Sequence, residues 1–132
     1  MDLDAAKAKL VELRESLVAA IDFFKELGLD PVRLETTVSL IEKLEGHLQV
    51  LDGSHSIGTL QKELRLTNVT LDLLRENLQS YESPPEKLLQ DVDEAQDEVQ
   101  KNIVKIKKLK RAGLNLAVAG VAAVGIYLVA KR

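Results

Sequence analysis

The sequence predicts an all-α protein, an antiparallel bundle of about four helices whose last helix continues into a C-terminal apolar (transmembrane) helix. Three observations predict this class. Apolar residues recur at alternating spacings of three and four along most of the chain, which is the period of an amphipathic helix. Helix-stop and helix-start signals divide this pattern into four segments. An uncharged run of nineteen residues, 112–130, follows the last segment.

The first helix is expected over 3–27, where apolar or small residues form a single stripe. The stripe comprises Leu3, Ala6, Leu10, Leu13, Leu17, Ala20, Phe24 and Leu27. Val11, Val18 and Ile21 widen it beyond the narrow seam of a two-stranded coiled coil, which favours a globular bundle. Gly28 is the expected stop, because glycine readily adopts the left-handed conformation that ends many helices.

The second helix is expected to begin at Asp30 and Pro31, since aspartate can cap free backbone N–H groups and proline is favoured at the first helical position. Its apolar stripe comprises Leu34, Val38, Ile41, Leu44, Leu48 and Leu51. The tripeptide 52–54, Asp-Gly-Ser, then predicts a turn.

The third helix is expected to begin between Ser56 and Thr59 and to continue to about Tyr81. One face of it comprises Ile57, Leu60, Leu64, Thr67, Leu71, Leu74, Leu78 and Tyr81. The β-branched residues at 67, 69 and 70 favour a strand locally, but the leucine spacing on both sides keeps the helical period.

The fourth helix is expected to begin at Ser83, with Pro84 at its first position and Glu86 completing a capping box. Its stripe comprises Leu88 or Leu89, Val92, Ala95, Val99, Ile103 and Ile106. No proline separates this helix from the apolar run after it, so the two are expected to be continuous.

The run 112–130 has the properties of a membrane span. As a helix it would extend about 28 Å at roughly 1.5 Å per residue, close to the thickness of a hydrocarbon core. Its apolar and small residues are Ala112, Gly113, Leu114, Leu116, Val118, Gly120, Val121, Val124, Gly125, Ile126, Tyr127, Leu128, Val129 and Ala130. Its basic flank comprises Lys105, Lys107, Lys108, Lys110, Arg111, Lys131 and Arg132. The alternative is a buried central helix of a soluble bundle, but such a helix usually keeps a polar stripe, and this one is apolar all round.

The position of the span predicts a tail anchor inserted after translation, because only Lys131 and Arg132 follow it. The heavier basic cluster precedes the span, which places the bundle in the cytosol by the positive-inside tendency. The first residues have no basic region followed by an apolar one, so no secretory signal is expected. The predicted organisation is thus a cytosolic helical bundle (1–111), an anchor (112–130) and a short basic tail (131–132).

A short span rich in alanine and glycine, with basic residues on both sides, resembles the tail anchors of the mitochondrial outer membrane. This resemblance covers only the tail and favours that membrane over the endoplasmic reticulum, which stays an alternative. The pairs Gly113 with Ala117 and Ala119 with Ala123 would let two spans approach closely in a homo-oligomer, although any alanine-rich span contains such pairs.

Charge is divided unevenly along the chain. Residues 101–132 hold eight of the eighteen basic residues and no acidic one, which leaves ten basic against twenty-one acidic residues before them. Membrane lipid with anionic headgroups suits the basic segment better than nucleic acid does, because no aromatic residues alternate with the basic ones to stack on bases. The acidic run Asp91, Asp93, Glu94, Asp97 and Glu98 is either the solvated face of the fourth helix or a docking face for a basic partner.

No catalytic, metal or cofactor site is expected, and the protein is not expected to be an enzyme. The chain has no cysteine, and its two histidines, His47 and His55, lie on either side of a predicted turn without acidic residues at ligand spacing. The expected function is a tail-anchored adaptor or tether whose bundle binds a protein partner that the sequence does not identify. The alternative is a membrane-permeabilising or membrane-remodelling protein of the pore-forming, cell-death type. A SNARE-like fusion factor ranks third, because Pro84 and Pro85 interrupt the heptads.

Overall fold

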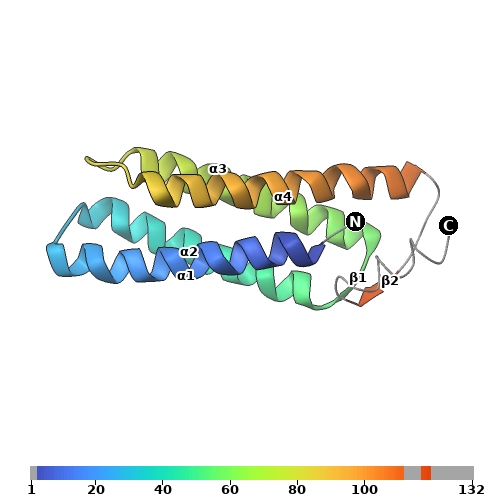
Figure 1. Cartoon of the computed structure of the whole chain (residues 1–132). Coiled ribbons are helices and arrows are strands. Elements are labelled where there is room, and N and C mark those ends of the chain that lie inside the picture. Colours follow the sequence, from blue (N-terminus) through green and yellow to red (C-terminus); the bar gives the residue numbers. More distant parts are fainter. Residues whose placement is uncertain (1–2, 112–116, 120–132) are drawn as a thin grey trace.

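Within residues 3–111 the fold consists of four long helices, α1 (Leu3–Leu27), α2 (Pro31–Asp52), α3 (Ile57–Gln79) and α4 (Glu86–Arg111). A computed structural model describes residues 3–111 and 117–119 of the chain. Successive helices run in opposite directions, and α4 returns alongside α1, so each helix packs on two neighbours around one core (Figure 1). The predicted helical bundle is therefore confirmed.

The core of the bundle is built mainly of leucine. Every residue predicted on the inner face of α3 is buried, from Ile57 to Tyr81. On α2 and α4 the predicted stripes are buried as well, except that Val38 and Ile103 are only partly buried and pack against the core. Leu88, and not Leu89, is the buried member of its pair.

The stripe of α1 departs from the prediction toward its C-terminal end. A 3.5-residue apolar repeat drifts by about 20° per seven residues on a straight helix of 3.6 residues per turn. By the sixth turn the buried position has moved from Ala20 to Ile21, which is 6% exposed, while Leu27 is 54% exposed. The prediction that Leu27 belongs to the core is wrong for this reason.

The end of α1 is a Schellman motif, as the glycine stop predicted. Gly28 has φ 66°, in the left-handed region that glycine adopts without steric cost. Its N–H donates to the carbonyl of Lys25 at 3.1 Å, and the N–H of Leu29 donates to the carbonyl of Phe24 at 3.1 Å. These two bonds satisfy carbonyls that would otherwise lack a helical partner.

The start of α2 has the predicted proline but not the predicted cap. Asp30 lies in the left-handed region at φ 40°, and its side chain makes no capping hydrogen bond. Its carboxylate instead lies 3.5 Å from the guanidinium of Arg33.

The start of α3 matches the prediction, because Ser56 is the N-cap and accepts a hydrogen bond from the N–H of Thr59 at 3.2 Å.

The start of α4 corrects the sequence prediction by two residues, because the predicted first helical position was Pro84. The helix begins at Glu86, and the first helical N–H, that of Leu89, donates to the carbonyl of Pro85 at 3.0 Å. A residue that precedes proline is driven away from helical backbone angles. Ser83 and Pro84 both precede a proline, so the helix cannot begin before Pro85, and the predicted capping box does not form.

Two short strands accompany the helices. β1 (Ser54–Ser56) joins α2 to α3 and pairs antiparallel with β2 (Ala117–Ala119). Neither was predicted, because 117–119 was assigned to a continuous helix; here its backbone groups pair with β1. The rest of the predicted span, 112–116 and 120–130, and the basic tail 131–132 lie outside the described residues. None of the four described helices combines the length and the apolar character that a bilayer crossing requires.

Candidate functional site

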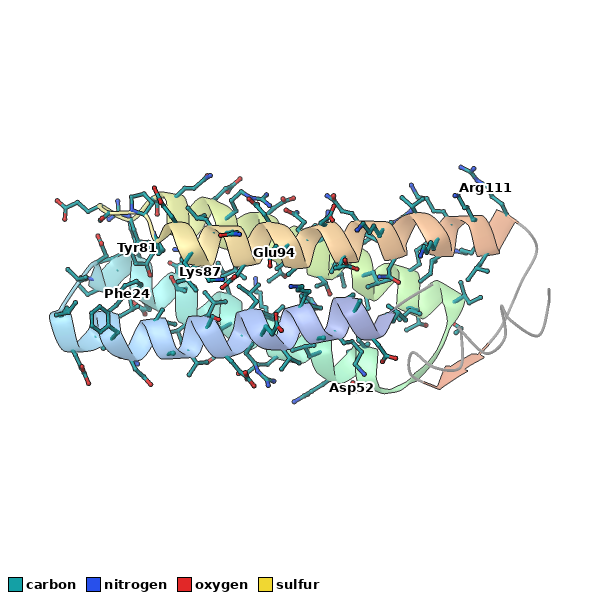
Figure 2. All side chains as sticks on the ribbon, viewed as in Figure 1. Phe24, Asp52, Tyr81, Lys87, Glu94 and Arg111 are labelled. Atoms are coloured by element: carbon teal, nitrogen blue, oxygen red, sulfur yellow. The ribbon has the colours of Figure 1, made fainter. Side chains whose placement is uncertain are left out.

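The C-terminal end of α4 carries the predicted basic flank. Lys105, Lys107, Lys108, Lys110 and Arg111 are all exposed, and Figure 2 shows Arg111 at the far end of the helix. Buried Ile106 and Leu109 hold this end of α4 on the bundle. The amine of Lys110 donates to the side-chain oxygen of Gln61 at 2.9 Å, which joins α4 to the start of α3. The two remaining flank residues, Lys131 and Arg132, lie outside the described residues.

The predicted acidic face on α4 is paired within the bundle. Every one of its carboxylates has a basic partner: Asp91 with Lys87 at 2.7 Å, Asp93 with Arg75 at 2.7 Å, Glu94 with Lys9 at 3.3 Å, Asp97 with Lys101 at 3.3 Å and Glu98 with Lys101 at 3.6 Å. The carboxylates also diverge, because Asp93 pairs with α3 whereas Glu94 pairs with α1. Docking of a basic partner here stays a prediction, and that partner would compete with these ion pairs.

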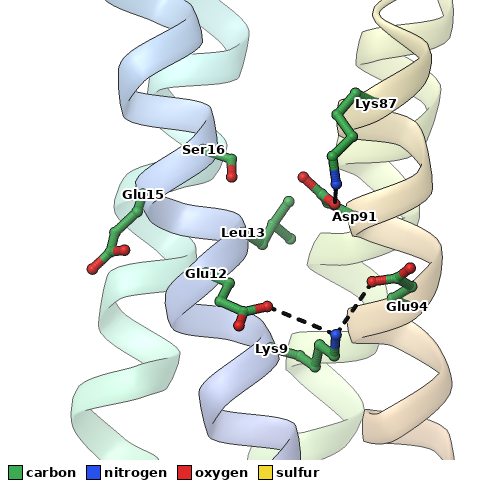
Figure 3. Close-up of a pocket in the computed structure, with 8 residues that line it drawn as sticks. All are labelled: Lys9, Glu12, Leu13, Glu15, Ser16, Lys87, Asp91 and Glu94. Atoms are coloured by element: carbon green, nitrogen blue, oxygen red, sulfur yellow. Dashed lines mark hydrogen bonds and ion pairs between the residues drawn. The ribbon is translucent and has the colours of Figure 1, made fainter.

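A shallow polar groove lies between α1 and α4, as Figure 3 shows. Lys9 stands in it between Glu12, at 3.7 Å, and Glu94, at 3.3 Å. The hydrogen bond to Glu94 raises the pKa of Lys9 above its ordinary value of 10.5, and Asp91 raises that of Lys87 in the same way. Both amines are therefore charged at neutral pH and are not nucleophiles. The groove is an ion-paired seam between helices.

Comparison with known proteins adds no assignment. No protein-family model, curated protein or solved structure matches this chain. Its function is therefore inferred from its own residues.

Three polar clusters join the helices, and the sequence did not predict them. His47 of α2 lies 2.6 Å from the Glu63 carboxylate and 2.8 Å from the Thr70 hydroxyl, both on α3. Arg75 of α3 donates to Asp93 of α4, and buried Gln96 donates to Asn68 at 3.0 Å. The third cluster joins Thr37, Asn77 and Tyr81 at the opposite end of α3. Since the partners lie far apart in sequence, only helical register could have indicated them.

The described residues hold no metal-binding cluster of three or more His, Asp or Glu side chains. His47, one of the two histidines in the sequence, uses both ring nitrogens in hydrogen bonds, one with Glu63 and one with Thr70. The pairing is the kind that orients helices in a bundle, because it satisfies polar groups that are mostly withdrawn from water.

Exposed apolar side chains gather around the α1–α2 connection. This grouping was not predicted from the sequence. Phe23 is 57% exposed, Leu27 54%, Leu29 42% and Val32 76%. We call these four residues the apolar tip. Figure 1 places the α1–α2 connection at the end of the bundle opposite to the end of α4. We call the C-terminal part of α4 that carries Lys105, Lys107, Lys108, Lys110 and Arg111 the basic end. The apolar tip and the basic end are separated by roughly the length of the 26-residue α4, about 39 Å at 1.5 Å per residue.

Proposed function

We propose that this protein is a membrane-anchored adaptor, held to lipid by residues 112–130, whose bundle presents a binding surface to a protein partner. The supporting observation is the adjacency of that uncharged run to a helix end with five exposed basic residues. Basic side chains at a membrane boundary reach anionic headgroups, while a nineteen-residue apolar helix matches the hydrocarbon thickness. In this proposal the β1–β2 pairing opens when the segment enters lipid as a helix.

The apolar tip supports the adaptor part of the proposal. A monomeric surface seldom clusters large apolar side chains without a use for them. With the basic end against the membrane, the tip would face away from it, where a partner has access. Phe23 packs on Phe24, whose ring centroid lies 5.6 Å from that of buried Tyr81, so the tip rests on the core through aromatic contacts. A rigidly supported apolar surface loses little entropy when a partner binds.

Charge insertion into the apolar run tests the anchor. The full chain with Val121→Arg and Val124→Arg should be released from cell membranes by alkaline extraction, because each arginine costs roughly 2.5–3.5 kcal/mol at the centre of a span. The control carries the same two new charges on α3, as Val69→Arg and Leu73→Arg, at positions that are 53% and 40% exposed. Retention of the control and release of the first variant are the expected results. Equal extraction of both variants and the unmodified chain would exclude the anchor.

A photo-crosslinking side chain tests the tip separately. Placed at Val32, the most exposed residue of the tip, it should give a discrete protein adduct in membranes that hold the full chain. The matched control is the same probe at Lys43, an exposed position of α2 away from the tip. The same adduct from both positions would contradict a specific surface at the tip.

A further inference from the structure

Lys62 and Arg65 of α3 lie at the same end of the bundle as the basic end of α4, although about 40 residues separate them from it in sequence. Lys62 and Arg65 are both exposed. The hydrogen bond from Lys110 to Gln61 aligns the first turns of α3 with the last turns of α4. Figure 1 shows the same arrangement, with the start of α3 and the end of α4 at one end of the bundle.

Helical spacing places Arg65 on the edge of α3 that faces α4. Gln61, Asn68 and Asp72 each bond to a residue of α4, namely Lys110 or Gln96. Arg65 falls between them at spacings of four and three, so it belongs to the same stripe. On α4, Gln96 and Gln100 bond to Asn68, and Lys107 continues that stripe seven residues further on. Arg65 and Lys107 therefore share one face formed by two helices.

None of these cations has a carboxylate partner within the described part of the chain. The set without an ion pair comprises Lys62, Arg65, Lys105, Lys107, Lys108, Lys110 and Arg111. The nearby acids are engaged elsewhere, since Glu63 pairs with His47 on the α2 side and Asp97 pairs with Lys101. Along the rest of α4 every carboxylate of the acidic face is paired, so the contrast between the two halves of this helix is sharp. Unpaired like charges repel one another, and binding of an anionic surface relieves that repulsion.

We propose that Lys62 and Arg65 join the end of α4 in a two-helix surface that binds anionic lipid headgroups. The inference rests on the proposed membrane anchor, because the surface adjoins the uncharged run that would enter the bilayer. The chemistry favours lipid over single-stranded nucleic acid, which needs aromatic platforms beside the cations. The aromatic residues Phe23, Phe24 and Tyr81 lie at the opposite end of the bundle, where Phe24 contacts each of the other two.

Vesicle flotation tests this surface with the full chain, translated in a cell-free reaction in the presence of vesicles. The vesicles are phosphatidylcholine alone or phosphatidylcholine with phosphatidylserine, and the readout is the lipid concentration that floats half of the chain. Each basic residue near an anionic surface contributes about a fivefold gain in affinity, so K62Q/R65Q should require about 25-fold more anionic lipid. The matched control, K25Q/K43Q, removes two exposed charges away from the basic end and should differ little from the unmodified chain.

The outcomes separate the surface from the anchor. Flotation with neutral vesicles that survives an alkaline wash reports the anchor, whereas a gain from phosphatidylserine that salt abolishes reports the basic surface. The expected result is a selective loss of that gain in K62Q/R65Q, with helical content and thermal unfolding unchanged. Equal losses in K62Q/R65Q and K25Q/K43Q would overturn the proposed surface even if the anchor holds. An equivalent loss of binding to a single-stranded RNA oligonucleotide, without loss of lipid binding, would also overturn it.

Discussion

The hydroxyl of Tyr81 lies 2.7 Å from the hydroxyl of Thr37, which joins the α3–α4 connection to α2. Both residues are buried, at 5% and 1% exposure. The Thr37 hydroxyl also donates to the backbone carbonyl of Arg33 at 2.9 Å. Either hydroxyl can be the donor in the hydrogen bond between Tyr81 and Thr37. This contact fixes the segment between α3 and α4 to the end of the bundle that carries the apolar tip.

Tyr81→Phe is expected to lower the free energy of unfolding by about 1 kcal/mol, because it removes a buried hydrogen bond while preserving the ring. Chemical denaturation of the full chain in detergent, monitored by circular dichroism, measures the change. Thr37 keeps other hydrogen-bond partners, which limits the loss. An unchanged denaturation midpoint would show that the contact contributes nothing.

The ionisation of Tyr81 should also make the folding stability depend on pH in the alkaline range. Burial raises the pKa of Tyr81 above its ordinary value of 10.0. Above that value the unfolded chain loses the phenolic proton while the folded chain retains it, so folding stability falls as pH rises from about 10 toward the raised pKa. The stability difference between the unmodified chain and Tyr81→Phe should therefore shrink over this interval. Ultraviolet absorbance of the unmodified chain, compared with that of Tyr81→Phe, measures the ionisation of Tyr81. Ionisation at the ordinary pKa would contradict the raised pKa of the buried hydroxyl.

A pair of leucines on α3 tests the assignment of the core. Leu64 is fully buried and Leu66, two residues on, is 44% exposed. Leu64→Ala should cost about 2–5 kcal/mol of folding free energy, because it leaves a cavity among packed side chains. Leu66→Ala should lower the folding free energy much less. Similar losses from the two substitutions would show that the face of α3 assigned to the core is wrong.

The histidine cluster should behave as a coupled pair. His47→Ala leaves the Glu63 carboxylate, whose side chain is only 14% exposed, without its partner at 2.6 Å. The single substitutions His47→Ala and Glu63→Ala should each destabilise the bundle by about 1–3 kcal/mol, and the double substitution by less than their sum. A double-mutant cycle by denaturation measures the coupling, and additive losses would argue against an interaction.

Sequence periodicity located α3 (Ile57–Gln79) closely, because the apolar spacing keeps one face from Ile57 to Tyr81, with buried Thr67 at the one polar position. It failed at Leu27, where a 3.5-residue repeat drifts off the face of a 3.6-residue helix. The predicted N-cap at Ser83 was wrong because Pro84 and Pro85 drive the residues before them away from helical backbone angles. Local pattern thus located the helices, while the ends depended on backbone sterics.

The candidate site was predicted only where it is continuous in sequence. The basic residues of α4 lie together along the chain, so composition alone identified them. Lys62 and Arg65 join them only through the antiparallel packing of α3 on α4, which the Lys110–Gln61 contact registers. The apolar tip likewise collects residues from the end of α1, the connection and the start of α2. Neither grouping follows from a single helical stripe.

Vesicle leakage distinguishes the adaptor from a permeabilising protein. The four helices bury their leucine stripes against one another, and exposing them would sacrifice that burial. The full chain should therefore bind dye-loaded vesicles without releasing the dye. Release in proportion to bound protein would favour the permeabilising alternative over the adaptor.

The depth of residue 121 in a bilayer tests the central proposal most directly. The chain contains no cysteine, so Val121→Cys provides a single attachment point for an environment-sensitive fluorophore, and Val69→Cys on α3 provides the exposed control. With the full chain on vesicles, quenchers attached deep in the acyl chains should quench the probe at 121 and leave the probe at 69 unaffected. Quenching of the probe at 121 by an aqueous quencher alone would contradict the proposed anchor.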